Sequence, residues 1–157
     1  MVLAQSLFKI LKLQHPDCII DVAAPAWTLP LIARMPEVNN GIALPFKHGQ
    51  FALIERIKFG KSLRLKAYTQ AIILTNSFKS AILPYAANIP QRTSFLGEMR
   101  YGLLNDIRPL DKARLPRTVD RFVTLGLPAG ADLPKTSRTQ RLFLTKKMRQ
   151  QRSKCWG

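Results

Sequence analysis

Cysteine, histidine and acidic residues are scarce in this sequence, and each shortage excludes a class of function. The two cysteines, Cys18 and Cys155, lie at opposite ends of the chain and match no metal-ligand spacing or disulfide framework. The two histidines, His15 and His48, have no carboxylate or thiol partner nearby in the sequence. Walker A, GxGxxG, HExxH, GxSxG and CxxC signatures are all absent. The residues alone therefore indicate no metal site and none of the common catalytic motifs.

Long apolar runs are also lacking. No run approaches the roughly 18 to 20 residues that span a bilayer, and the first residues lack the basic start and cleavage site of a signal peptide. We therefore expect a cytoplasmic protein. The chain has 157 residues, of which 46% are apolar. That length suits one ordinary domain, and that composition permits a packed core.

Acidic residues number nine against 25 Lys and Arg, which gives a net charge of +16. The charge is unevenly distributed: no acidic residue follows Asp132, and residues 134–157 contain eight of the Lys and Arg residues. Half of the net charge therefore belongs to the last segment, and the remainder of the chain is moderately basic. An anionic partner is favoured.

The order of apolar patterns predicts alternating helices and strands. Helical spacing of apolar residues occurs over residues 3–14, 28–35, 50–66 and 117–125, and over about ten residues after 74. Short apolar runs typical of strands occupy residues 18–24, 42–44 and 70–74. This alternation predicts a parallel sheet with helices on both faces. The chain opens directly on a helix, whereas a doubly wound domain normally opens on a strand.

Two glycines carry specific expectations. Gly60 lies in the middle of the helix predicted over 50–66 and should weaken it by roughly 1 kcal/mol relative to alanine. That helix groups its apolar residues on one side and most of its Lys and Arg residues on another. Gly126 follows the helix predicted over 117–125, where we expect it to act as the C-cap.

The clearest strand-to-helix step is TQAIILTNSFKS, residues 69–80, where an apolar run gives way to a polar break and then a helical pattern. Ligands of parallel α/β folds usually bind at such steps. Asn76 and Ser77 open the helix, where backbone N–H groups and the helix dipole favour an anion. Lys79 is slightly unfavourable in a first helical turn, which indicates a binding role; an ordinary surface lysine is an equally weighted alternative. These three residues are candidate anion-binding residues.

Other candidates follow the same reasoning. In FLGEMRYGLLND, residues 95–106, Gly97 and Gly102 allow close backbone approach, and Arg100 can make a bidentate contact to an acid. An ordinary loop with a surface salt bridge is the alternative. Arg92 is a weaker candidate of the same kind. Trp27, between small residues, can stack on a sugar or fill a gap between helices.

Several segments resemble a known family. They are QSLFKILK, DVAAPAWTLPLIARMPEV, LPFKHGQFAL, AIILTNSFKSAILPYAANIPQRT and GEMRYGLLNDIRPLDK. Together they are similar, in order and spacing, to the N-terminal half of the ADP-heptose:lipopolysaccharide heptosyltransferase II family (glycosyltransferase family nine). The resemblance runs from about residue 1 to 126.

The resemblance implies a GT-B glycosyltransferase, of which residues 1–126 form part of the N-terminal, Rossmann-like, acceptor-side domain. It implies a metal-independent, inverting transfer of heptose from ADP-heptose to the first heptose of the lipopolysaccharide core, with no cofactor. The acceptor, a heptosylated lipid A–Kdo glycolipid, is anionic. This gives a common role to the candidate acceptor-binding residues, which are Asn76, Ser77, Lys79, Arg92 and Arg100. It also implies transient contact with the inner face of the inner membrane.

The sequence departs from the family at both ends. The first strand and the aspartate implied as general base lie just before Met1, so we expect a gap in the sheet. Residues 127–157 form a basic tail where the donor domain is expected, as in a disordered or frameshifted product. We therefore expect the chain alone to be inactive. The alternatives are a small basic nucleic-acid-binding protein using residues 134–157, which lacks any recognisable RNA-binding motif, and a peripheral membrane protein held weakly by the tail.

Overall fold

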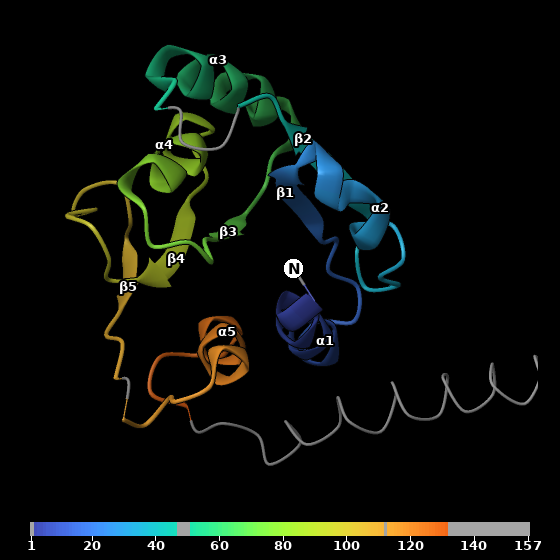
Figure 1. Cartoon of the computed structure of the whole chain (residues 1–157), viewed down its shortest axis with the longest axis vertical. Coiled ribbons are helices and arrows are strands. Elements are labelled where there is room, and N and C mark those ends of the chain that lie inside the picture. The colour runs from blue at the N-terminus through green and yellow to red at the C-terminus, as the bar shows by residue number, and fades with distance from the viewer. Residues whose placement is uncertain (1, 47–50, 112, 132–157) are drawn as a thin grey trace, which may run out of the picture.

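The computed structural model describes residues 2–46, 51–111 and 113–131 (Figure 1). Its helices are α1 (Gln5–Gln14), α2 (Leu29–Ile32), α3 (Leu53–Leu63), α4 (Phe78–Ala86) and α5 (Thr118–Gly126), with 3-10 turns at Val2–Ala4, Ala26–Thr28 and Arg64–Lys66. Its strands are β1 (Asp21–Pro25), β2 (Asn40–Leu44), β3 (Gln70–Ile72), β4 (Gln91–Phe95) and β5 (Asp106–Arg108). The predicted α/β alternation is confirmed.

All strand pairs are parallel, as predicted, but they form two sheets. One sheet pairs β1 with β2, and the other has the order β3-β4-β5. The sequence patterns did not predict β4 or β5, because β4 is polar and β5 is only three residues long. The buried hydroxyls of β4 form hydrogen bonds with the segments on either side of the strand. Ser94 Oγ donates to Ile73 O at 2.7 Å, and Thr93 Oγ1 donates to Asp106 Oδ2 at 2.9 Å. A central strand can therefore form without an apolar run.

The strands β1 and β3 belong to different sheets, in agreement with the expected gap. The two strands share no sheet hydrogen bonds among the described residues, and their amino ends are joined by side chains instead. Tyr68 Oη donates to Asp21 Oδ2 at 2.6 Å; burial and this carboxylate raise the pKa of Tyr68 to about 12.

The two sheets nevertheless share a core. Val22 of β1 and Leu74, just after β3, pack in one cluster with Leu7 of α1. Ile73 points to the opposite face and packs with Ala81 of α4. Helices α1 and α5 therefore cover one face, and Figure 1 shows α3 and α4 on the other side of the strands.

Gly126 does not act as a C-cap, contrary to the expectation from sequence. It is the last residue of α5 and is not among the residues with positive φ. A Cβ at this position would lie 2.5 Å from Leu7 Cδ1. The glycine therefore fits the close contact between α5 and α1, where a methyl group would displace the end of the Leu7 side chain. The sequence pattern does not reveal this contact.

Gly60 likewise serves helix packing. It is buried on α3, and a Cβ there would lie 2.6 Å from Ala86 Cβ and 2.8 Å from Leu83 O of α4. We expect Gly60→Ala to destabilise the protein by about 2 kcal/mol, because overpacking against backbone outweighs the gain of about 1 kcal/mol in helix propensity. Urea unfolding checks this, with Lys58→Ala, exposed on the same helix, as the control. A higher midpoint for Gly60→Ala would show that propensity dominates.

Candidate functional site

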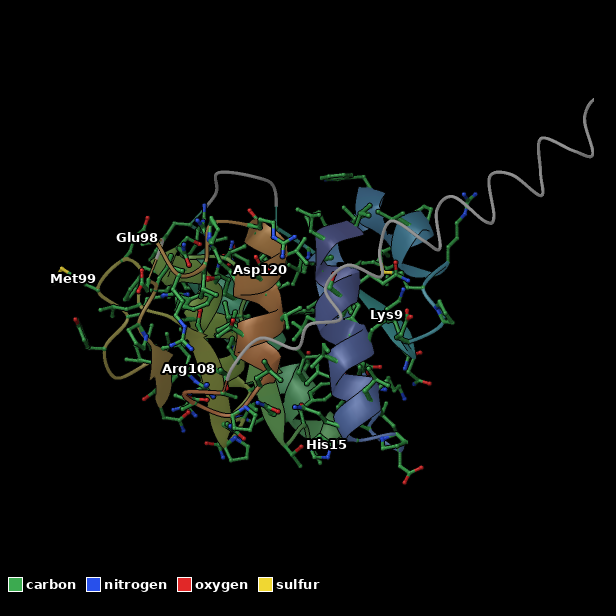
Figure 2. All side chains as sticks on the ribbon, turned by 90° about the horizontal axis from the view of Figure 1, so that it is seen from below. Lys9, His15, Glu98, Met99, Arg108 and Asp120 are labelled. Atoms are coloured by element: carbon green, nitrogen blue, oxygen red, sulfur yellow. The ribbon has the colours of Figure 1, made fainter. Side chains whose placement is uncertain are left out.

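Two loops meet where β3 and β4 end at the carboxyl edge of the second sheet. The first loop, residues 73–77, joins β3 to α4, and the second, residues 96–105, joins β4 to β5. Figure 2 shows Glu98 and Met99 of the second loop at the outer edge of the molecule, away from Lys9 and His15. The carboxyl edge is the usual ligand-binding edge of a parallel sheet.

The N-terminus of α4 already holds a carboxylate. Phe78 N donates to Glu98 Oε2 at 2.8 Å, so Glu98 occupies the position at which the sequence predicted a ligand anion. Ser77 is the N-cap residue in an extended conformation, but its side chain makes no capping hydrogen bond. Asn76 is exposed, and Ser77 and Lys79 are half-buried. Side chains rather than the helix end therefore remain to contact a ligand.

Gly97 brings the two loops together. Glu98 N donates to Asn76 O at 3.2 Å, and a Cβ on Gly97 would lie 2.5 Å from that same oxygen. The expected close backbone approach is thus confirmed for Gly97. Gly102 differs: its φ is +83° and nothing lies within 4 Å of its Cβ position, so it serves a turn and not an approach.

Arg100 is a buried clamp between these loops, with 0% of its surface exposed. Its Nη1 donates to Thr75 O at 2.8 Å, and its Nη2 donates to Phe95 O at 2.6 Å and to Ser94 Oγ at 3.0 Å. Burial lowers the pKa of Arg100, and the nearby charge of Glu98 acts in the opposite direction. The sequence suggested a bidentate contact to an acid; the structure gives the guanidinium neutral protein partners instead.

Arg92 lies away from the first loop and contacts the second loop near its end, where it meets β5. It is in the first half of β4, paired with Ala71, whereas Asn76 and Ser77 follow the end of β3. Its Nε donates to Leu103 O at 2.7 Å, and its guanidinium lies 5.5 Å from the ring centre of Tyr85. The structure therefore groups Asn76, Ser77 and Lys79 and separates Arg92 from them.

Exposed aromatic and apolar side chains follow the carboxyl ends of strands in both sheets, Trp27 in the first sheet and Met99 and Tyr101 in the second. Trp27 directly follows β1 and is 83% exposed, which excludes the gap-filling alternative. Thr28 holds the turn, since its Oγ1 donates to Pro25 O at 2.7 Å. Met99 and Tyr101 are 81% and 66% exposed in the second loop. Sequence reasoning missed both, although their position between the two glycines of the loop was a usable signal.

This arrangement can bind a polar or anionic saccharide. It offers an amide, a hydroxyl, an ammonium and exposed aromatic rings, and aromatic faces pack well against sugars. Over the described ranges, no three His, Cys, Asp or Glu residues are grouped so as to hold a metal ion. No helix in the same ranges is long and apolar enough to cross a bilayer.

Parallel strands with helices on both faces and polar loops at the carboxyl edge define a Rossmann-like, ligand-binding α/β domain. The model of glycosyltransferase family 9 (heptosyltransferase) matches residues 56–156, and the chain belongs to this family. The matched range extends beyond residue 126, at which the resemblance in sequence was expected to end.

Three similar proteins are named as heptosyltransferases. Lipopolysaccharide heptosyltransferase 2 of Salmonella typhimurium is 52% identical over 139 residues, which cover 85% of this chain and 40% of that protein. The Escherichia coli protein of the same name is 52% identical over 130 residues, with 83% and 37% covered. Lipooligosaccharide heptosyltransferase 2 of Haemophilus ducreyi is 50% identical, with 85% and 39% covered. The chain thus spans about 40% of the length of these relatives.

Solved structures agree on the fold. The structure of E. coli ADP-heptose lps heptosyltransferase II matches with a TM-score of 0.79 and 48% identity, covering 86% of this chain and 40% of that one. A glycosyltransferase family 9 protein from Veillonella parvula matches with a TM-score of 0.67 at 14% identity, covering 93% and 45%, and supports the fold alone. The predicted fold class, a Rossmann-like N-terminal part of a GT-B glycosyltransferase, is therefore confirmed. The domain bounds 1–126 stay a prediction. Residues 132–157 lie outside the described part, so the proposed tail and its nucleic-acid-binding alternative stay predictions.

Proposed function

We propose that this chain is the acceptor-side part of a lipopolysaccharide heptosyltransferase. In the whole protein, heptose passes from ADP-heptose to the first heptose of a heptosylated lipid A–Kdo acceptor. The observation that carries this proposal is the 52% identity, over 85% of the chain, to a protein named lipopolysaccharide heptosyltransferase 2. The polar side chains accessible at the carboxyl edge support an anionic acceptor of this kind.

Within this proposal, Asn76, Ser77 and Lys79 contact the acidic sugars and phosphates of the acceptor, and Trp27 packs against a sugar ring. Arg100 is a positioning residue, because its guanidinium holds the two loops and is fully buried. Glu98 already pairs with the α4 N-terminus, so it is not assigned the role of base. We place the protein in the cytoplasm, with transient contact at the inner membrane.

By itself the 157-residue chain is not expected to transfer heptose. It spans about 40% of the length of its relatives, and the family resemblance assigns both the base and the ADP-heptose site to other parts of the protein. A chimera tests the proposal more directly: residues 2–126 replace the matched region of the E. coli heptosyltransferase 2. We expect this chimera to transfer heptose to the acceptor. A folded chimera that binds ADP-heptose but transfers none would contradict the proposed function.

Lys79→Ala in this chimera is expected to raise the KM for the acceptor roughly tenfold, since a charge-assisted hydrogen bond contributes about 1.5–3 kcal/mol. The KM for ADP-heptose should stay unchanged. Steady-state kinetics with each substrate varied in turn checks this. Arg34→Ala, an exposed cation on another part of the fold, is the matched control. Equal acceptor KM values in the Lys79→Ala and Arg34→Ala variants would show that Lys79 does not contact the acceptor.

A further inference from the structure

Helix α3 has its apolar side facing outward. Ile54 is 65% exposed, and Leu65 in the 3-10 turn that follows is 93% exposed. The positions that the helix buries are Arg56 and Gly60 instead. At 100° per residue, Ile54 and Leu65 lie opposite those two buried positions. The sequence predicted a helix here, with its apolar residues on one side and most of its Lys and Arg residues on another. The second part is wrong for Lys58 and Lys61, which helical spacing places among the apolar residues. This side does not join the core of the described chain.

Positive charge is interleaved with these apolar side chains. Lys58 and Lys61 lie on the same outward face by helical spacing, and both are exposed. Neither forms an ion pair with any described residue. Residues 53–66 contain five Lys and Arg and one acidic residue, Glu55. The outward face of α3, defined as Ile54, Ile57, Lys58, Lys61 and Leu65, is therefore both apolar and cationic.

An apolar hollow borders this face. Its volume is about 420 Å³, within the usual range for a bound small molecule or acyl chain, and it lies between α3 and α4. Leu53 and Ile57 line it from α3, Phe78 and Ile82 line it from α4, and Lys61 also lines it. Because Phe78 lies between Ser77 and Lys79 in sequence, the hollow adjoins the candidate acceptor site.

We propose that the outward face of α3 is an interfacial surface that binds an anionic lipid bilayer. Surfaces of this type combine exposed Leu, Ile or Phe side chains, which enter the region between headgroups and acyl chains, with Lys or Arg side chains that meet anionic headgroups. Lysine suits this position because its aliphatic stem lies along apolar surface while its ammonium group stays in water. The inference rests on the proposed function, because it specifies how an enzyme with a lipid acceptor approaches that lipid.

Two other occupants fit the face less well. The buried centre of a protein interface is depleted in lysine, whereas Lys58 and Lys61 lie among the apolar residues here. Single-stranded nucleic acids bind to aromatic stacking platforms. The face itself carries the aliphatic Ile54 and Leu65. The exposed aromatic residues nearby, Phe51, Phe78 and Tyr85, line the apolar hollow instead. The hollow beside the face further favours an acyl chain as the apolar ligand.

Vesicle cosedimentation tests the proposal without any acceptor or donor. The full chain is mixed with vesicles of phosphatidylglycerol and phosphatidylcholine, or of phosphatidylcholine alone, at low and high salt. We expect binding to the anionic vesicles only, weaker at high salt. Ile54→Asn with Leu65→Asn should reduce binding roughly tenfold or more, as should Lys58→Gln with Lys61→Gln. Leu13→Asn with Ile19→Asn is the control, since these side chains are 77% and 73% exposed on another part of the chain.

The basic segment 134–157 requires its own control, because its cations alone attract anionic lipid. A full-length chain with these eight Lys and Arg residues replaced by Gln should retain the dependence on Ile54 and Leu65. The proposal is wrong if the chain ignores anionic vesicles, or if only the tail replacements reduce binding. Loss of heptose transfer in the chimera with intact vesicle binding would instead count against the proposed function alone.

Discussion

Adding one strand before Met1 is expected to raise the free energy of unfolding by several kcal/mol, on the order of 3, relative to the 157-residue chain. The extension consists of five or six Val- and Ile-rich residues followed by a Gly-Asp turn, placed before Met1. Such a strand would enter the gap between β1 and β3 and convert two sheets into one. The side-chain bridge from Tyr68 to Asp21 already spans this gap at its amino end.

This change in free energy has three parts: hydrogen bonds and apolar burial favour the added strand, and the cost of ordering its residues opposes it. A strand with a neighbour on each side gains about one net hydrogen bond, of roughly 0.5–1.5 kcal/mol, for each pairing along its two edges. Its apolar side chains would add to the shared core of α1 and β1, at about 1.5–3 kcal/mol for each one fully buried. Ordering five residues costs roughly 1–2 kcal/mol each. The gains exceed this cost by a few kcal/mol.

Urea unfolding followed by circular dichroism measures the effect. The control is an extension of the same length made of Gly and Ser, which cannot supply apolar contacts. We expect the strand extension, but not the control, to raise both the midpoint and the m-value, because more surface is buried in the folded state. Equal curves for the two extensions would mean that the gap does not accept a strand.

Sequence patterns predicted the elements whose local signals agree with their burial. The apolar run of β3 followed by Thr75 and Asn76 identified a strand, a loop and the start of α4. The patterns failed for β4 because its buried residues include Thr93 and Ser94, whose hydroxyls are satisfied by partners distant in sequence. Periodicity reports which residues share a face and does not report which face the rest of the fold covers. That is why α3 was predicted as a helix while its outward apolar side was unexpected.

In the candidate site, too, the sequence predicted the features that depend on local sequence and missed those that depend on contacts between distant segments. The strand-to-helix step located Asn76 and Ser77 correctly at a carboxyl strand end, since that step depends on local sequence. The roles of Glu98 and Arg100 depend on a contact between two loops 20 or more residues apart in sequence. An arginine between glycines looks the same in a sequence whether it faces a ligand or is buried under a loop. Only the fold distinguishes the two cases.

Replacing Arg100 is expected to cost about 3 kcal/mol or more of folding free energy. Arg100→Met would leave the buried acceptors Phe95 O and Ser94 Oγ without their guanidinium donor, and each unsatisfied buried group costs roughly 1–3 kcal/mol. It would also remove the contact to Thr75 O, which is only partly buried. Arg100→Lys should recover little of this, because a lysine ammonium cannot reproduce the planar fork that meets three acceptors. Arg34→Met, at an exposed position, is the control and should change stability little.

The strand-extended chain is the suitable background, since a loss of this size would leave the shorter chain close to unfolded. Urea midpoints give the stability, and the chimera with E. coli heptosyltransferase 2 gives the function. Because Arg100 ties residue Thr75 to the end of β4, Arg100→Lys should also raise the acceptor KM without touching the acceptor itself. If Arg100→Lys matches the unsubstituted chain in both measurements, the fork geometry is not what holds the two loops. A lower midpoint with an unchanged KM would limit Arg100 to stability and detach it from the acceptor site.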